Sequence, residues 1–395
     1  MAELLTVKIS FRKKPARWLL CSFLFIIPFT SPAQYEHKLF TSSLLVEFKG
    51  YYGFLYAQHL ELERFNAHFP AFELNIEQQT YGKHPWEIAY NYPIIGMSFL
   101  YSGLGYDPNL GQAFALMPFI NFTLYKDKIF TFGFRFALGA GYLTKKFDRL
   151  TNYKDLAIGS HINAAINLMF EGRFRLGEYL SLTAGICLQH FSNGSLKTPN
   201  YGVNAPMLSA GLAYRPVREN KDLVDRFIAP TQPFSAIIRH AIEFEIGFAL
   251  GYKNMQSEYG HNYFVYHAFE NTFFQVSRKS KVGFGFDASY DASHVKKLEM
   301  ADVQVTNQLQ IIRPGINAAY ELMLSRLCFI VNFGAYLGGK EKSNGPFYEK
   351  CCFQYQFSKN FFAHVLLKVH WGRADYIGWG FGYNFSVKYG KKTIK

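Results

Sequence analysis

Apolar residues alternate with polar or small residues over long segments of this chain. From Phe130 to Tyr142, one set of alternate positions holds Phe, Leu, Ala or Tyr, and the other set holds Thr, Gly, Arg or Ala. The same period of two recurs in residues 242–252, 282–290, 312–322 and 327–337. Because successive side chains of a strand point to opposite faces, the pattern predicts strands with one apolar and one polar face.

The residue types on the two faces narrow the fold class. The apolar face is mainly Phe, Leu and Ile, while the opposite face carries Gly, Arg, Glu and Asn. A soluble β-sandwich also alternates, but an apolar face this rich in aromatic residues suits the lipid-facing exterior of an outer-membrane β-barrel with a wet interior. Aromatic residues make up 18% of the chain, with 41 Phe and 27 Tyr. Beyond the N-terminus no segment is apolar for about 18 residues, so we expect no transmembrane helix.

The connections between these strands alternate in length. Short turns are predicted near residues 126–128, 175–178, 277–280, 323–326 and 358–360. Longer loops are predicted near residues 144–157, 193–203, 254–262, 291–308 and 339–350. Short periplasmic turns and long extracellular loops are typical of outer-membrane barrels. The fold class is therefore all-β, a transmembrane antiparallel β-barrel of about sixteen strands.

One charged, Pro-bearing connection, residues 216–236, is long although it falls among the short turns. It divides the predicted strands into two groups of about eight, which indicates a doubled eight-strand unit over residues 34–215 and 237–395. The sequence is compatible with one large barrel or with two small ones, and we favour the single barrel.

The N-terminus has the organisation of a secretory signal peptide. A basic stretch, residues 12–17, precedes an apolar run, residues 18–29, and then Ser31-Pro32-Ala33. An N-terminal membrane anchor is the alternative, but a run of about 12 residues is short for a helix that spans a bilayer. We therefore predict a signal peptide over residues 1–33.

Charge and cysteine content bear on partners and cofactors. The chain has 42 Lys and Arg against 29 Asp and Glu, a formal net charge of +13. A basic balance suits an anionic partner, and for a barrel we expect a phosphorylated lipid rather than nucleic acid. The cysteines beyond the signal peptide, Cys187, Cys328, Cys351 and Cys352, lack metal-ligand spacing. We predict no metal and no organic cofactor.

Candidate chemistry lies at the end of the strand over residues 181–192. His190 and Ser192 share one face of this strand, roughly 7 Å apart along it. They can act as general base and nucleophile, or they can be ordinary polar residues at a barrel rim. Because both continue the apolar stripe of their strand, we expect them to face the lipid.

Three asparagines could complete this site. Asn204 begins the next strand on the same face, where its amide oxygen could orient His190 by accepting the Nδ1 hydrogen. Asn193 and Asn200, in the intervening loop, could donate hydrogen bonds to an oxyanion. All three asparagines could instead be ordinary turn residues.

Three short motifs carry a resemblance to a known family: His190-Phe191-Ser192-Asn193-Gly194, Pro199-Asn200-Tyr201-Gly202 and Gly211-Leu212-Ala213-Tyr214. Over these roughly 30 residues the chain resembles the outer-membrane lipid A 3-O-deacylases (PagL type). The resemblance implies an eight-stranded barrel whose outer face carries a Ser-His-Glu triad, which hydrolyses an acyl ester of lipid A in the outer leaflet.

The resemblance assigns roles to residues of this chain by position. Ser192 becomes the nucleophile, His190 the base, and Asn193 and Asn200 contributors to the oxyanion site. The acid of the family falls on Asn204, so the third catalytic position departs from the pattern. The chain is also about twice as long as the family barrel.

The sequence thus predicts a serine esterase of the bacterial outer membrane that removes an ester-linked acyl chain from lipid A or lipopolysaccharide. The second half ends its penultimate strand in His370-Trp371-Gly372, with Gly in place of the serine, so we predict that it is not catalytic. The alternative is a non-enzymatic barrel, either a porin-like channel or a structural protein, and a transporter for hydrophobic compounds is a weaker option. The sequence leaves a homodimer open.

Overall fold

The computed structural model describes residues 43–218, 241–255 and 261–388. The predicted signal peptide, residues 1–33, lies outside the described residues, as does most of the predicted linker, residues 216–236. Within the described ranges, no helix has the length and apolar character needed to cross a membrane.

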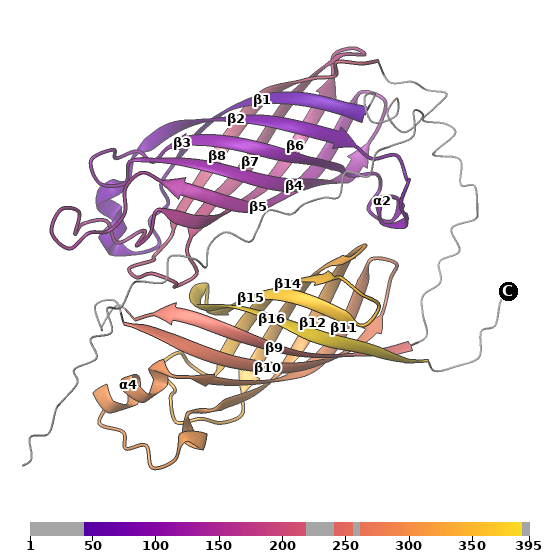
Figure 1. The fold of residues 1–395 in the computed structure, drawn as a ribbon. Coiled ribbons are helices and arrows are strands. Elements are labelled where there is room, and N and C mark those ends of the chain that lie inside the picture. Colours follow the sequence, from indigo (N-terminus) through magenta and orange to yellow (C-terminus); the bar gives the residue numbers. More distant parts are fainter. Residues whose placement is uncertain (1–42, 219–240, 256–260, 389–395) are drawn as a thin grey trace, which may run out of the picture. The chain divides into compact units, whose positions relative to one another are not determined.

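The first eight strands form a closed antiparallel barrel, drawn from indigo to magenta in Figure 1. They are β1 (Leu44–Phe54), β2 (His68–Gln79), β3 (Ile94–Gly103), β4 (Gln112–Lys126), β5 (Phe130–Leu143), β6 (Ile162–Arg175), β7 (Leu180–Ser192) and β8 (Val203–Tyr214). Each strand pairs with the next one in the sequence. The barrel closes where β8 pairs with β1, with Tyr214 opposite Val46.

The next eight strands form a second closed barrel, drawn from salmon pink through orange to yellow in Figure 1. They are β9 (Ala241–Asn254), β10 (Asn262–Gln275), β11 (Ser280–Asp291), β12 (Arg313–Leu324), β13 (Leu327–Tyr336), β14 (Phe347–Gln356), β15 (Phe361–His370) and β16 (Arg373–Lys388). This barrel closes where β16 pairs with β9, with Tyr383 opposite Ile246.

The predicted fold class, an antiparallel all-β barrel protein of about sixteen strands, is confirmed, but our preference for a single large barrel is wrong. Alternation along a strand and the lengths of its connections are the same in both arrangements. The arrangement is decided by which outer strands meet, and here β8 pairs with β1 and β16 with β9. The doubled eight-strand unit is therefore two separate barrels.

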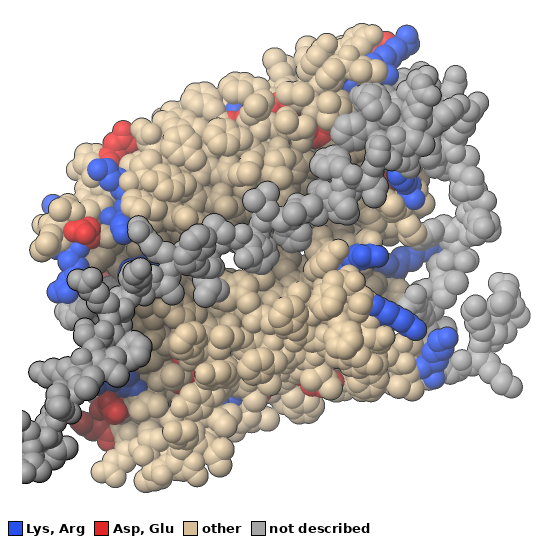
Figure 2. All heavy atoms as spheres, in the orientation of Figure 1, with Lys and Arg blue, Asp and Glu red and all other residues tan. Residues whose placement is uncertain are grey.

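Alternation along the strands places apolar side chains on the outside of each barrel. Exposed residues at alternate positions include Phe48, Phe72, Ile186, Phe286 and Phe381. Figure 2 shows the consequence on the face in view, where the strand regions are mostly free of charged atoms and Lys, Arg, Asp and Glu gather near the strand ends. An apolar band between polar rims is the surface that a barrel presents to a bilayer.

Polar side chains, together with some apolar ones, fill the lumen of each barrel. In the first barrel, the Arg135 guanidinium donates to a Glu73 carboxylate oxygen 2.7 Å away, and Lys49 bridges Glu47 and Glu171. In the second barrel, ion pairs join Lys281 to Glu321, Lys253 to Asp291 and Lys350 to Asp287. An eight-stranded barrel has an interior just wide enough for side chains to fill, and these charged groups pair because isolated charges are costly to bury.

The two ends of each barrel differ, and Figure 1 shows the longer loops at one end. The loop end holds the short helices η1 (Leu60–Phe65), α4 (Ser293–Met300) and η3 (Gln308–Ile311), whereas α2 (Pro85–Ala89) lies in the β2–β3 connection at the turn end. Buried apolar residues close the lumen of the first barrel beneath its loops: Leu55, Leu62, Leu104, Leu110, Leu143 and Ile158. By the rule for outer-membrane barrels, the loop end is extracellular.

Candidate active site

Strand β7 presents two chemically different faces. Its lumen-facing residues, Thr183, Cys187, Gln189 and Phe191, are buried, while Leu182, Ile186 and Leu188 at the alternate positions are exposed. His190 and Ser192 continue this outward stripe at the loop end of the strand, and both are half-buried. The structure therefore places both side chains on the outside of the barrel, at the extracellular end of its apolar band.

Pairing between β7 and β8 brings His190 and Asn204 together. The two residues stand opposite each other in the register, and His190 Nδ1 lies 2.7 Å from Asn204 Oδ1. An amide oxygen is an acceptor, so this hydrogen bond requires the proton of the neutral imidazole to be on Nδ1. The Nε2 atom is thereby left as the basic nitrogen. Asn204 is only 6% exposed, so water competes little for this contact.

Ser192 lies among hydrogen-bond donors of the following loop. Its Oγ accepts from Asn200 Nδ2 at 2.9 Å and from the backbone N–H of Gly194 at 3.2 Å. Among the hydrogen bonds of the described residues, none joins His190 to Ser192. Bonds between a catalytic base and its nucleophile are often long or absent until substrate binds.

Asn193, the other predicted oxyanion donor, makes its hydrogen bonds within the loops. Its side-chain amide donates to Ser160 Oγ at 2.9 Å and to the Lys197 carbonyl oxygen at 2.8 Å. The backbone N–H of Asn193 donates to Asn200 Oδ1 at 3.1 Å. This hydrogen bond orients the Asn200 side chain, whose Nδ2 donates to Ser192 Oγ. The side chain of Asn193 thus holds the loop and orients Asn200, and it does not point at the nucleophile.

The β5–β6 loop supports the β7–β8 loop from one side. Gly202 N–H donates to the Ala157 carbonyl oxygen at 2.9 Å. A Cβ on Gly159 would lie 2.8 Å from the carbonyl oxygens of Lys197 and Pro199, so only glycine permits this close approach. Asp155 lies at the base of the same loop, where its carboxylate accepts from Ala157 N–H at 3.1 Å, and burial raises the pKa of Asp155 to about 7.

Three residues of this neighbourhood were assigned no role from the sequence: Ser160, Gly159 and Gly202. Gly202 has φ of +81°, and a Cβ there would lie 3.0 Å from His190 Cε1, so a larger residue would displace the imidazole. The motif Pro199-Asn200-Tyr201-Gly202 contained a signal for this position. Ser160 and Gly159 act across a gap of more than thirty residues, which no local pattern reveals.

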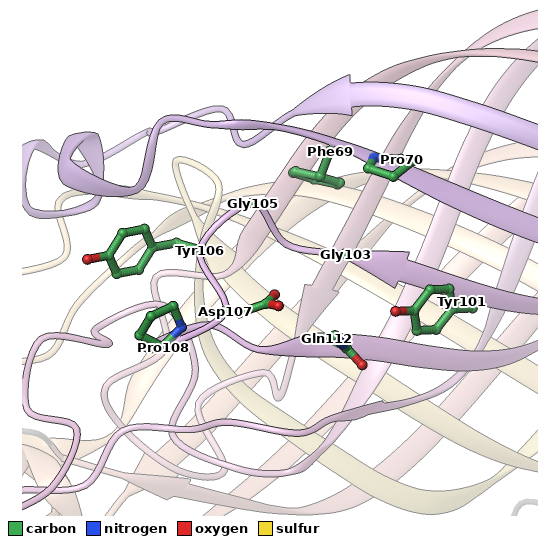
Figure 3. Close-up of a pocket in the computed structure, with 9 residues that line it drawn as sticks. All are labelled: Phe69, Pro70, Tyr101, Gly103, Gly105, Tyr106, Asp107, Pro108 and Gln112. Carbon is green, nitrogen blue, oxygen red and sulfur yellow. The ribbon is translucent and has the colours of Figure 1, made fainter.

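A separate hollow of about 440 Å³ lies at the loop ends of β2, β3 and β4 (Figure 3). Its lining includes Phe69, Tyr101, Tyr106 and Asp107, and no residue of the predicted site. In the closed strand order, β3 lies four strands from β7. The hollow is therefore not part of the candidate active site.

The second barrel places its corresponding histidine on the other face of the wall. His370 is buried in the lumen, where its Nε2 lies 2.9 Å from the Tyr336 hydroxyl and its Nδ1 lies 3.8 Å from Asp375. The next two residues, Trp371 and Gly372, supply no hydroxyl. The second barrel thus lacks an outward His-Ser pair at this position.

Two family models match the chain. The model for lipid A 3-O-deacylase (PagL) matches residues 71–213, a segment that contains all five predicted site residues. The model for the C-terminal domain of acyloxyacyl hydrolase (PagL_C) matches residues 242–387, which span the second barrel from β9 to β16. Together these matches cover most of the chain. No curated protein matches it.

Similar solved structures include a bacterial surface protein, an outer membrane enzyme and a porin. Neisserial surface protein A is 10% identical, with a TM-score of 0.31 over 44% of this chain and 96% of that one. The outer membrane enzyme PagL is 15% identical, with a TM-score of 0.29 over 42% of this chain and 97% of that one. A Rhodopseudomonas blastica porin triple mutant is 7% identical, with a TM-score of 0.17 over 87% and 99% of the two chains. Because these TM-scores are low, the family assignment rests on the two family models alone.

Proposed function

We propose that this protein, which belongs to the outer-membrane lipid A 3-O-deacylase (PagL-type) and acyloxyacyl hydrolase-like family, hydrolyses an acyl ester of lipid A with Ser192 as nucleophile and His190 as base. The family places it in the bacterial outer membrane and makes it a lipid A deacylase, a hydrolase. The serine esterase mechanism, the residues that carry it and their confinement to the first barrel are our proposal.

The position of His190 and Ser192 carries this proposal. A soluble substrate would meet an enzyme at a cleft open to water, but these two side chains lie on the lipid-facing side of the barrel wall. The substrate that reaches such a site without leaving the membrane is a lipid of the outer leaflet. Lipid A meets this condition, and its acyl esters offer the carbonyl carbon that a serine attacks.

The hydrogen bonds of His190 suit the role of general base. With its proton on Nδ1 held by Asn204, the imidazole presents Nε2 as the atom that takes the Ser192 proton as Oγ attacks the ester carbonyl. The resulting imidazolium then donates that proton to the departing sugar oxygen. Water hydrolyses the acyl-enzyme by the same steps, which releases a fatty acid and restores Ser192.

Asn204 sets a limit on the rate of this reaction. An amide oxygen fixes the tautomer of His190 as a carboxylate would, but it carries no charge to stabilise the imidazolium. We therefore infer that this chain is a slower esterase than one with an acid at position 204. Asn204 supplies the hydrogen-bond geometry of the acid without its negative charge.

The donors around Ser192 suit the stabilisation of an oxyanion. The Gly194 N–H and the Asn200 amide both point at Ser192 Oγ, 3.2 and 2.9 Å away. In the tetrahedral intermediate, the negative oxygen forms next to this atom, within reach of the same donors. Asn193 contributes indirectly, since its backbone N–H orients Asn200.

A porin-like channel, the alternative function, finds little support in the lumens. Arg135, Phe119, Met117 and Met169 are buried inside the first barrel, and the apolar residues beneath its loops close the extracellular end. Tyr348, Tyr376 and Lys350 are buried inside the second. Side chains that fill an interior leave no water path for solutes.

Mass spectrometry of lipid A from cells that express the protein tests the proposal. We expect wild type to remove one acyl chain and Ser192→Ala to remove none, because the nucleophile is lost. Ser386→Ala, which changes an exposed serine of β16, is the matched control and keeps full activity. Heat-modifiable gel mobility checks that each variant is folded. Deacylation by folded Ser192→Ala would refute the mechanism.

A further inference from the structure

The tip of the β5–β6 loop is an ordered turn. The Asp148 carboxylate accepts from the backbone N–H groups of Leu150 and Thr151, each at 2.9 Å, and from the Thr151 hydroxyl at 3.0 Å. Asn152 N–H donates to the Asp148 carbonyl oxygen at 3.0 Å, and the Asn152 amide bonds the neighbouring loop at Asn109. The backbone of the tip is thus fixed from within and from one side.

This fixed tip displays two large apolar side chains to the outside. Leu150 is 89% exposed and Tyr153 is 60% exposed. Arg149 and Lys154 are their neighbours in the chain, and both are exposed, with the Lys154 ammonium 5.9 Å from the centre of the Tyr153 ring. Lys145, at the start of the same loop, is exposed as well. An aliphatic and an aromatic residue flanked by Lys and Arg form the pattern that binds the boundary between lipid headgroups and acyl chains.

The acidic residues of this loop do not cancel its positive charge towards solvent. The loop carries four cations, Lys145, Lys146, Arg149 and Lys154, against two acids, Asp148 and Asp155. Asp148 is exposed, whereas Asp155 is buried at the base of the loop. The outward surface of the loop therefore has an excess of positive charge, which complements the phosphates of a lipid headgroup.

The base of the same loop contacts the loop that follows Ser192. Tyr201 N–H donates to the Leu156 carbonyl oxygen at 3.3 Å, and the Asn193 amide donates to Ser160 Oγ at 2.9 Å. A lipid held by the tip would therefore be held by an element rigidly joined to the candidate active site.

We propose that the β5–β6 loop, residues 144–161, is the docking element for the phosphorylated headgroup of lipid A. Leu150 and Tyr153 enter the boundary of the acyl chains, and Lys145, Arg149 and Lys154 bind the phosphates. The loop thereby positions the acyl ester for Ser192. This inference rests on the proposed lipid A deacylase function, and it adds to that function a residue set that selects phosphorylated over phosphate-free lipid.

Kinetics with the purified full chain in detergent test the selectivity. The substrates are lipid A with its phosphates and the same lipid A after chemical dephosphorylation. We expect wild type to prefer the phosphorylated form about tenfold in kcat/KM, and Arg149→Ser/Lys154→Ser to lose this preference through a higher KM with kcat retained, because headgroup binding is lost while the reacting atoms are untouched. Leu150→Ser should raise KM for both substrates.

The matched control is Lys128→Ser/Ile129→Ser, which changes an exposed cation and a 65% exposed apolar side chain at the turn end of the same barrel. It should keep both KM values. Equal preference for phosphorylated lipid A in the wild type and the Arg149→Ser/Lys154→Ser protein would overturn the inference.

Binding without hydrolysis separates this inference from the proposed function. Native mass spectrometry of Ser192→Ala should show more bound phosphorylated lipid A than dephosphorylated lipid A, and the added Arg149→Ser/Lys154→Ser change should abolish the difference. This result would support the loop even if wild type hydrolysed no ester, an outcome that would refute the esterase alone. Equal binding of phosphorylated and dephosphorylated lipid A to Ser192→Ala would refute the loop's selectivity.

Discussion

The two barrels share a strand order and a histidine near the end of the penultimate strand, yet they place that histidine on opposite faces. His190 continues the outward stripe of β7 and bonds Asn204, whereas His370 of β15 is buried in the lumen and contacts the Tyr336 hydroxyl. A shift of one residue along a strand moves a side chain to the other face. Whether the histidine can act on a lipid or is buried in the lumen thus depends on whether it lies at an outward or an inward position of its strand.

The largest test of this comparison exchanges each histidine for alanine. His190→Ala should lower kcat/KM for lipid A by at least about a thousandfold, because the hydrogen-bond partners of Ser192 Oγ among the described residues, Asn200 and Gly194, are donors and do not accept its proton. His370→Ala should leave deacylation unchanged. Acyl release measured on both purified variants checks this, and a large loss in His370→Ala would show that the second barrel takes part.

The two lumens offer the next contrast. Arg135 is paired with Glu73, while the Lys368 ammonium lies 4.8 and 4.1 Å from the rings of Tyr336 and Tyr348 with no hydrogen-bond partner among the described residues. Arg135→Met should destabilise the protein by about 3–5 kcal/mol, because it leaves a buried carboxylate without its cation. Lys368→Met should be neutral or stabilising by about 1 kcal/mol.

Urea unfolding in micelles, followed by tryptophan fluorescence, measures both effects. If Lys368→Met lowered the free energy of unfolding as much as Arg135→Met, the Lys368 ammonium would stabilise the second barrel through an interaction that its contacts do not explain.

A smaller effect is expected from giving the first barrel the acid that its third catalytic position lacks. Asn204→Asp should raise kcat/KM about tenfold, because a carboxylate accepts the same Nδ1 hydrogen and also stabilises the imidazolium. Asn204→Leu should lower it, since the tautomer of His190 is no longer fixed. A slower Asn204→Asp enzyme would show that position 204 tolerates no charge and that the amide is required.

The smallest effect concerns pH and the loops. Burial raises the pKa of Asp155 to about 7. Burial would also raise the pKa of Glu341 in the second barrel, but the Ser343 hydrogen bonds and the charges of Lys297 and His294 outweigh it and hold that pKa below its ordinary value. Between about pH 4 and 7, Asp155 is ionised only in the unfolded chain, so the stability it contributes falls as pH rises. The contribution of Glu341 is instead present above about pH 4.5 and is lost as pH falls.

Hydrogen exchange, corrected for its intrinsic pH dependence, measures this contrast. The β5–β6 loop should open more readily at pH 7 than at pH 5, and Asp155→Asn should remove that change. The β13–β14 loop, which carries Glu341, should open only under more acidic conditions. Identical profiles for the two loops would contradict the assignment of opposite pKa shifts.

The sequence predicted the strands well because alternation is local. The outward stripe of β7 and the His190–Asn204 pair both follow from period two and from the pairing of two strands that are consecutive in the sequence. The closure of each barrel could not be predicted in this way, since Val46 pairs with Tyr214 across almost the whole first unit. The same limit explains why the contact of Asn193 with Ser160, a residue of a different loop, could not be predicted.

The even number of strands in each barrel has a consequence for how such a chain can be assembled. An up-and-down wall of eight strands returns the chain to the side on which it started, so β1 begins and β8 ends at the same end of the cylinder, as do β9 and β16. A gene that duplicates such a unit can join the copies by a tether that stays in one compartment and never has to be threaded through the bilayer. One copy can then retain its catalytic residues while the lumenal residues of the other change, because no described strand of one barrel pairs with a strand of the other.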